Sequence, residues 1–234
     1  MGNYVFRWDV LWTSPYKDWL VSGIGKTLVI GASAWIIALG VGIVVGMCRA
    51  AASRPLRALG TVYVEVFRNI PLLVQLFVWY YVVPPLFGTA FIRMPNLNLY
   101  VAIVGLGLYT ASRVAEHIRS GLNGVGKGQY WAGLSTGLTH FQLYRYVIVP
   151  HSIRLVIPPL TTEFLTIFKN SSLALTIGVL ETTGAANRIS SSTFQGIEAL
   201  TAAMLTYLVI GLTVVGIMSL IERRTRIPGL YGRG

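Results

Sequence analysis

The sequence predicts an all-α polytopic membrane protein with five transmembrane helices, a periplasmic N-terminus and a cytoplasmic C-terminus. Of its 234 residues, 54% are hydrophobic and only 12% are charged, whereas a soluble domain usually carries about a quarter charged residues. The mean hydropathy is +0.64. The charges are also segregated, so that uncharged runs long enough to cross a bilayer alternate with polar segments.

The first 22 residues are predicted to lie along the periplasmic membrane surface. Trp8, Trp12, Tyr16 and Trp19 recur close to one helical face, and such aromatic side chains favour the headgroup region. This stretch lacks the basic and apolar regions of a cleaved signal peptide, so insertion is expected to rely on the first span. Cys48 is the only cysteine, which excludes a disulfide framework.

Three uncharged runs supply the spans of the first half, predicted at about 24–48, 66–90 and 95–115. Gly42 and Gly46 lie four positions apart in the first run, a spacing that favours close helix packing. Pro71 is expected to kink the second span. Glu65 and Arg68, three positions apart, are expected to pair at the polar end of that helix.

The charge distribution predicts two further spans, at about 155–180 and 199–221. Residues 49–57, 113–154 and 223–234 hold 3, 5 and 4 of the 19 Lys and Arg residues, and the positive-inside rule places all three segments in the cytoplasm. An even number of crossings must therefore separate the second basic segment from the third. The first of these two spans is the less obvious one, because ionisable residues interrupt it.

A polar segment from Gly128 to Pro159 lies between the third and fourth spans. From Gln129 to Phe141 its apolar residues recur along one side of a predicted amphipathic helix, at Trp131, Leu134, Leu138 and Phe141. Gly133 and Gly137 would let a partner approach this helix closely. No regular helix is expected to continue unbroken through Pro158 and Pro159. On the residues alone, a surface helix joining two spans and a helix presented to a soluble partner are equally supported.

This segment resembles the EAA loop of ABC-importer permeases, which reads G-Q-x-E-A-A-x-x-L-G and is followed by L-P, R and P-P. The matching positions are Gly128, Gln129, Ala132, Gly137, Pro150, Arg154, Pro158 and Pro159. Trp131 stands where the family has glutamate, and Gly133 where it has the second alanine. In that family the loop is a coupling helix that docks in a groove of a cytoplasmic ATPase. The resemblance therefore implies a coupling loop over residues 128–154, with contacts from Gly128, Gln129, Trp131, Ala132, Gly133, Leu134, Gly137, Leu138, Pro150 and Arg154.

A second stretch extends the resemblance. YVEVFRNIPLLVQL, which begins at Tyr63, matches the YxExFRxxPLLVQL signature of the polar amino-acid subfamily of ABC permeases. Together with SAWIIALGVGIVVGMCR and ASRVAEHIRSGL, it is similar to the permease subunits of glutamate/aspartate importers over about residues 20–226. The resemblance implies an ABC type-1 transmembrane domain over residues 23–222, a basic cytoplasmic tail over 223–234, and a location in the bacterial inner membrane.

The resemblance also implies partners. The family works as two permease subunits, identical or different, with two cytoplasmic ATPase subunits and a periplasmic binding protein that delivers the amino acid. ATP and Mg are expected in the ATPase, because Leu20 stands where the GIGKT sequence at 23–27 would need the first glycine of a phosphate-binding loop. The net charge of +11 lies in loops between apolar runs, which favours membrane topology over nucleic-acid binding.

Polar residues inside the predicted spans are candidates for a translocation path, because burying them is costly unless they are paired or hydrated. The fourth span carries Glu163 and Lys169, and the KNSSL sequence resembles the K-x-(S/T)-(S/A)-L element of the family. The alternative, equally supported, is that Glu163 and Lys169 interact with each other or that their side chains reach out to water. The candidate residues are Glu163, Lys169, Asn170, Ser171, Ser172 and Gln75.

No catalytic or metal site is predicted. The spacing of His117, His140 and His151 fits no metal motif, and these residues are expected to be solvated in cytoplasmic loops. A stand-alone secondary transporter is the first alternative function, but such transporters usually carry internal repeats and more spans. A membrane-anchored scaffold is the second, and it gains nothing from intramembrane charge. An importer of another polar amino acid also remains open.

Overall fold

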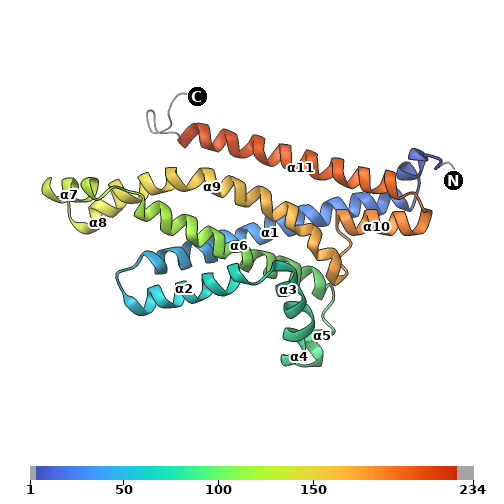
Figure 1. The fold of residues 1–234 in the computed structure, drawn as a ribbon, viewed down its shortest axis with the longest axis horizontal. Coiled ribbons are helices and arrows are strands. Elements are labelled where there is room, and N and C mark those ends of the chain that lie inside the picture. Colours follow the sequence, from blue (N-terminus) through green and yellow to red (C-terminus); the bar gives the residue numbers. More distant parts are fainter. Residues whose placement is uncertain (1–3, 226–234) are drawn as a thin grey trace. The chain divides into compact units, whose positions relative to one another are not determined.

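The computed structural model describes residues 4–225, and every regular element in that range is helical (Figure 1). The chain divides into two compact units. Unit 1 comprises Met1–Ile36, Ile70–Gly107 and Leu165–Thr213, and unit 2 comprises Ile37–Asn69, Leu108–Phe164 and Val214–Gly234. Four long helices contribute residues to both units: α1 (Tyr16–Ala50), α6 (Leu97–Asn123), α9 (Val149–Asn170) and α11 (Gly196–Thr225).

Three helices of the described range, α1, α6 and α11, are long and apolar enough to cross a membrane. A fourth candidate arises if α2 (Arg54–Asn69) and the helices that follow it up to Leu86 are counted as one bent span. The three clear helices coincide with the spans predicted at 24–48, 95–115 and 199–221. The chain is therefore a multi-pass membrane protein, and the span at 155–180 stays a prediction.

Unit 1 is built around the first part of α1. The short 3₁₀ helix η1 (Trp8–Trp12) and α10 (Thr182–Thr193) belong to it, as do η4 (Ser171–Ile177), α3 (Leu72–Phe77), the π-helix η2 (Val78–Val82), α4 (Val83–Leu86) and α5 (Thr89–Ile92). Val10 of η1 is buried with Ala186 and Ile189 of α10 and with Ala199 and Ala203 of α11. Small side chains dominate this cluster, and they allow the helices to approach closely.

Unit 2 is held by close packing of the second part of α1 against α6. A Cβ atom added at Gly42 would lie 2.5 Å from Val114, and one added at Gly46 would lie 2.7 Å from Ile118. Neither space could hold a side chain, which confirms the close packing that the glycine spacing predicts. The remaining elements of unit 2 are α2, α7 (Lys127–Ser135), α8 (His140–Leu143) and the π-helix η3 (Tyr144–Ile148).

The kink expected at Pro71 is confirmed. α2 ends at Asn69, α3 starts after Pro71, which lacks the backbone N–H that would continue the ladder, and the two helical stretches are bent by 101°. α1 begins at Tyr16, so the last residues of the predicted surface segment 1–22 belong to the same helix as the first span, and the surface location of that segment stays a prediction. The expectation that no helix continues through Pro158 and Pro159 is wrong, because α9 includes both. Each proline removes one helical hydrogen bond, and membrane helices tolerate such losses where neighbouring groups compensate.

Candidate functional site

The predicted coupling segment is a helix–turn–helix in unit 2 rather than one helix. α7 ends at Ser135, and α8 begins at His140. Gly137 has φ of +85°, its N–H donates to Leu134 O at 3.0 Å, and the N–H of Leu138 donates to Gly133 O at 3.3 Å. This pair of bonds is a Schellman motif, which ends a helix at a left-handed glycine. The continuous helix predicted from Gln129 to Phe141 is therefore wrong.

A capping box starts the second helix of the segment. The Thr139 hydroxyl accepts from the N–H of Gln142 at 3.3 Å, and the Gln142 side chain accepts from the N–H of Thr139 at 2.9 Å. Reciprocal bonds of this kind satisfy two backbone donors that a helix start leaves unpaired. Because both ends of the turn are closed by hydrogen bonds, α7 and α8 are held in a defined relation.

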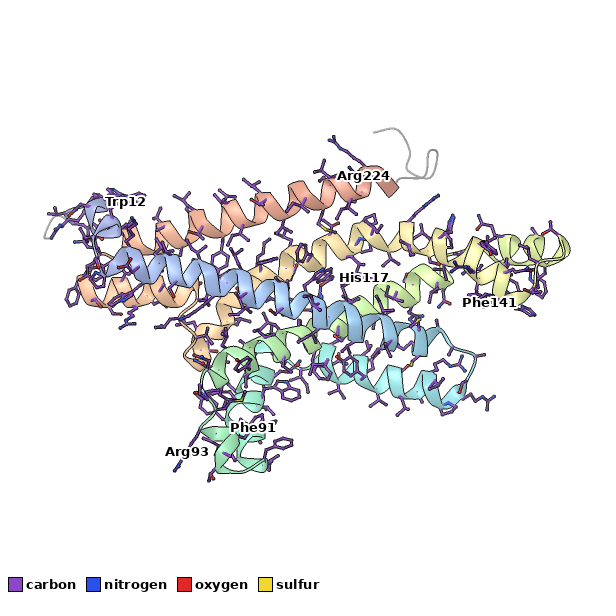
Figure 2. The ribbon with its side chains drawn as sticks, turned by 180° about the vertical axis from the view of Figure 1, so that it is seen from behind. Trp12, Phe91, Arg93, His117, Phe141 and Arg224 are labelled. Atoms are coloured by element: carbon purple, nitrogen blue, oxygen red, sulfur yellow. The ribbon has the colours of Figure 1, made fainter. Side chains whose placement is uncertain are left out.

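The predicted apolar stripe separates into an inner pair and an outer pair. Leu134 and Leu138 pack against a buried cluster of Val125, Leu143 and Ile148. Trp131 is 63% exposed and Phe141 is 75% exposed, and Figure 2 shows Phe141 on the outside of α8. Large exposed aromatic side chains outside the long apolar helices suit contact with another protein.

The two glycines of the segment have different surroundings. A Cβ atom at Gly133 would lie 2.4 Å from the Leu143 side chain, so this glycine makes room for α8. The expectation that Gly133 admits a partner is wrong. Gly137 has no heavy atom within 4 Å of its added Cβ position, and it stays a candidate contact. Gly128, Gln129 and Ala132 are exposed on α7, while Pro150 is half-buried and Arg154 exposed in α9.

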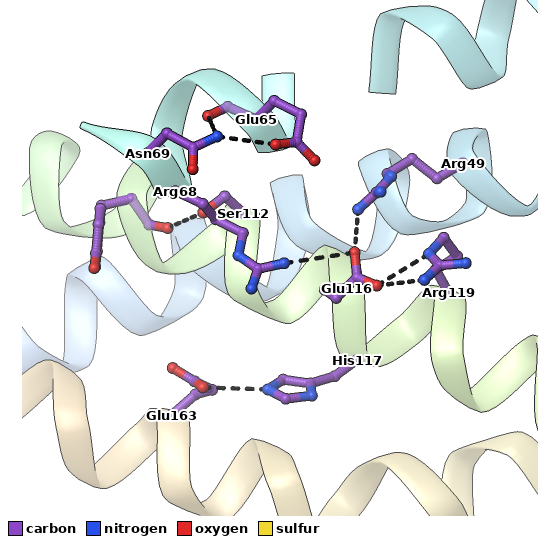
Figure 3. A network of polar contacts seen from close by, with 10 residues as sticks. Arg49, Glu65, Arg68, Asn69, Ser112, Glu116, His117, Arg119 and Glu163 are labelled. Carbon is purple, nitrogen blue, oxygen red and sulfur yellow. Dashed lines mark hydrogen bonds and ion pairs between the residues drawn. The ribbon is translucent and has the colours of Figure 1, made fainter. Parts of the chain in front are cut away.

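Glu116 of α6 joins three helices of unit 2. Its carboxylate binds Arg49 of α1 and Arg119 of its own helix, and it lies 3.8 Å from Nη1 of Arg68 on α2 (Figure 3). The expected Glu65–Arg68 pair is therefore wrong. The carboxylate of Glu65 instead accepts from Nδ2 of Asn69 at 2.9 Å. Three guanidinium groups around one carboxylate offset the cost of its partial burial.

Glu163 of α9 forms the second ionic cluster of unit 2, and its side chain is only 4% exposed. Nε of Arg113 donates to one carboxylate oxygen at 2.6 Å. Nε2 of His117 lies 3.2 Å from the other oxygen, as Figure 3 shows. Both partners come from α6, so the cluster fastens α9 to α6. His117 is thus a helical residue in contact with Glu163, and the expectation that it is solvated in a loop is wrong.

The other candidates for a translocation path lie in unit 1. α3 packs against η4, which places Gln75 in the same part of the unit as Ser171 and Ser172. Gln75 is buried and donates to Ile70 O at 2.8 Å. Ser171 is buried and donates to Phe168 O at 2.7 Å. Lys169 is exposed, and Asn170 and Ser172 are half-buried.

Two buried carboxylates of unit 1 were not among the predicted residues. Glu181 caps α10, accepting from the N–H of Gly184 at 2.9 Å and from the hydroxyl of Tyr207. Glu198 accepts from the N–H of Arg7 at 2.7 Å and from the hydroxyl of Tyr4. The signal for Glu181 is a negative charge just before a helix, where it interacts favourably with the helix N-terminus. Nothing local in the sequence relates Glu198 to residues 4–7.

Comparisons with known proteins extend over nearly the whole chain. Residues 38–227 match the family described as "Binding-protein-dependent transport system inner membrane component". The chain is 39% identical to the glutamate/aspartate import permease protein GltJ of Escherichia coli (strain K12), covering 94% of this chain and 92% of the relative. It is 35% identical to the probable glutamine ABC transporter permease protein GlnM of Bacillus subtilis (strain 168), covering 90% and 93%.

A solved structure shows the same fold. The crystal structure of an amino acid ABC transporter with histidines has a TM-score of 0.82 and 31% sequence identity, and the match covers 95% of this chain and all of that chain. The matching family is one of transport components, which confirms the prediction of a transport subunit rather than an enzyme. The ABC type-1 transmembrane fold is likewise confirmed. The chain therefore belongs to the family of binding-protein-dependent transport system inner membrane components.

Proposed function

We propose that this chain is the permease subunit of an ATP-driven importer in the bacterial inner membrane, with glutamate and aspartate as its substrates. The similarity to a glutamate/aspartate import permease supports the substrate. The proposed topology has five spans, with a periplasmic N-terminus and a cytoplasmic C-terminus. Residues 1–22 are assigned to the periplasmic side, 23–222 to the transmembrane domain and 223–234 to the cytoplasmic tail, and of these, 1–3 and 226–234 lie outside the described residues.

The observation that carries the proposal is the exposed face of the α7–α8 segment. Trp131 and Phe141 project from a turn closed by a Schellman motif and a capping box. Aromatic anchors on a rigid segment bind a partner with little loss of conformational freedom. We assign this face to docking on the ATPase, with Trp131 supplying apolar contact where the family pattern has glutamate.

The proposed complex holds two permease subunits, two cytoplasmic ATPase subunits and a periplasmic amino-acid-binding protein. ATP and Mg are bound by the ATPase, and no cofactor is assigned to this chain. The second permease subunit is either a copy of this chain or a different chain, and the subunit composition of the purified complex distinguishes the two cases. Membrane lipid surrounds the apolar helices, and no nucleic-acid partner is proposed.

The proposed translocation path is lined by Lys169, Asn170, Ser172 and Gln75 of unit 1, with Ser171 supporting its wall, and Glu163 is a separate candidate in unit 2. Lys169 is the residue that we assign to the negative charge of an acidic amino acid. Its side chain is exposed, while Glu163 is already engaged by Arg113 and His117. This arrangement favours a substrate-facing cation at position 169 over the alternative in which Lys169 only balances Glu163.

A second substrate is supported by a specific observation. The chain is also similar to a probable glutamine permease, so glutamine is the leading alternative among polar amino acids. A stand-alone secondary transporter has weaker support, since the matching family is described as binding-protein-dependent.

Co-purification with the ATPase tests the proposal. The tagged chain and its ATPase are expressed together, and the ATPase retained on the affinity resin is quantified. We expect stable retention, and we expect Trp131→Ala combined with Phe141→Ala to reduce retention about tenfold or more, as loss of two anchor residues does. Phe91→Ala, which removes an exposed aromatic side chain from unit 1, should leave retention unchanged. Equal retention in all three proteins would reject the docking face.

A further inference from the structure

Phe194 combines two unfavourable features in one residue. It has φ of +58° and ψ of +17°, in the left-handed region that bulky side chains rarely adopt. It is also 87% exposed, more than any other large hydrophobic residue of the described range. Asn96 is the other non-glycine residue with positive φ in that range, and asparagine tolerates this conformation well. Glycine would relieve the strain at position 194, and a polar residue would avoid the exposure.

The turn that carries Phe194 is held firmly within unit 1. It joins α10, which ends at Thr193, to α11, which begins at Gly196. The N–H of Phe194 donates to Ser190 O at 2.8 Å, and the N–H of Gln195 donates to the Thr193 hydroxyl at 3.2 Å. The Thr193 hydroxyl in turn donates to Ile189 O at 2.8 Å. The turn therefore presents the ring in a defined direction before any partner arrives.

The chain before Phe194 is polar. It reads NRISSST from Asn187 to Thr193, and Asn187, Arg188, Ser191 and Ser192 are exposed. On the other side of the turn Ile197 is 49% exposed, and the hydroxyl of Tyr4, itself 42% exposed, donates to Glu198. An exposed aromatic ring with hydrogen-bonding groups on one side and apolar groups on the other suits a contact between proteins.

We propose that Phe194 is the anchor residue by which this chain docks its periplasmic solute-binding protein. The inference rests on the proposed function, which places the α10–α11 turn on the periplasmic side. The matching family is described as binding-protein-dependent, so a soluble partner on that side is required. The ring would enter an apolar pocket of the binding protein, and the hydroxyl groups of residues 190–193 would form the rim of the contact.

The test measures binding of the periplasmic glutamate-binding protein of the source bacterium, purified and fluorescently labelled, to the complete importer in nanodiscs. We expect Phe194→Gly and Phe194→Asn to weaken binding about tenfold or more, as loss of an anchor residue does. Both residues accept the left-handed conformation, so the thermal stability of the complex should be unchanged or higher. Phe194→Tyr keeps the ring and should bind within about twofold of the original chain. Asn96→Gly, which changes the other left-handed residue, should have no effect.

A photoreactive phenylalanine analogue at position 194 identifies what the ring touches. A covalent adduct with the binding protein supports the proposal, and adducts with lipid alone overturn it. Equal affinity of the original chain and the Phe194→Gly variant would also overturn it, while the importer function would stand. If the original chain itself binds no solute-binding protein, the proposed function fails together with this inference.

Discussion

Single carboxylates hold the helices of unit 2 together, and Glu163 is the most enclosed of them. Replacing Glu163 by Gln keeps the shape of the side chain and removes its charge. Arg113 and His117 then lose their anionic partner, and we expect a loss of about 1–3 kcal/mol in stability. Arg113 is partly exposed, so water compensates some of the loss. The melting temperature in detergent should fall by roughly 2–4 °C per kcal/mol.

Glu65→Gln is the matched control for this change, because Glu65 is exposed and its carboxylate contacts the neutral Asn69. Its melting temperature should stay within about one degree of the original, as for an ordinary surface substitution. If both variants melt at the same temperature, the Glu163 cluster does not fasten α9 to α6.

Lys169→Met tests the residue proposed to meet the substrate. The variant keeps the apolar stem and removes the positive charge. If Lys169 faces an acidic amino acid, glutamate uptake should fall about tenfold, which corresponds to roughly 1.4 kcal/mol of lost attraction. Lys17→Met removes an exposed cation near the start of α1 and should leave uptake unchanged. Recovery of uptake in Lys169→Met combined with Glu163→Gln would instead assign Lys169 to charge balance with Glu163.

Ion pairs between side chains on different helices are the feature of the structure that the sequence predicts least well. Glu116 and Arg119 are neighbours on one helix, but Arg49 and Arg68 reach the same carboxylate from α1 and α2. These contacts depend on how α1, α2 and α6 pack together, and no local sequence pattern predicts them. The expectation for His117 is wrong for the same reason, because its partner Glu163 lies 46 positions away in the chain.

The left-handed turn at Gly137 ends α7 and separates it from α8. Two substitutions at this glycine test whether the coupling segment docks on the ATPase. Aspartate and asparagine both tolerate the left-handed conformation and have the same shape. Docking would bury the carboxylate introduced by Gly137→Asp without a partner, which costs more than burying an amide. Gly137→Asp should therefore lose amino-acid uptake while membrane levels stay normal, and Gly137→Asn should retain more uptake. Normal transport and normal ATPase binding by Gly137→Asp would show that this turn does not contact the ATPase.

The apolar elements could be predicted better than the irregular ones. Lipid requires long helices with satisfied backbones, so the uncharged runs correctly located α1, α6 and α11, and Gly42 and Gly46 correctly indicated close packing. The end of α7 was missed, although a glycine just after an apolar periodic stretch is a recognised stop signal. Continuation of α9 through Pro158 and Pro159 could not be foreseen, because it depends on tertiary packing around the two missing hydrogen bonds.

The topology of the whole molecule can be checked with reporter fusions. The charge distribution places Gly88 and the region near Ser190 in the periplasm, and Gly126 and Gly234 in the cytoplasm. The second fusion is best made after Gln195, because Ser190 lies inside α10. Alkaline phosphatase should be active after Gly88 and Gln195 and inactive after Gly126 and Gly234. An inactive fusion after Gln195 would remove the span at 155–180 and with it the five-span topology.

Uptake into proteoliposomes tests most directly whether this chain moves an amino acid with energy supplied by another subunit. The chain is reconstituted with its ATPase, its second permease subunit and the glutamate-binding protein, and radiolabelled glutamate accumulation is measured with and without ATP and Mg on the ATPase side. The proposed function predicts accumulation only when ATP, Mg, the ATPase and the binding protein are all present. Accumulation by this chain alone, driven by an ion gradient and indifferent to ATP, would contradict it.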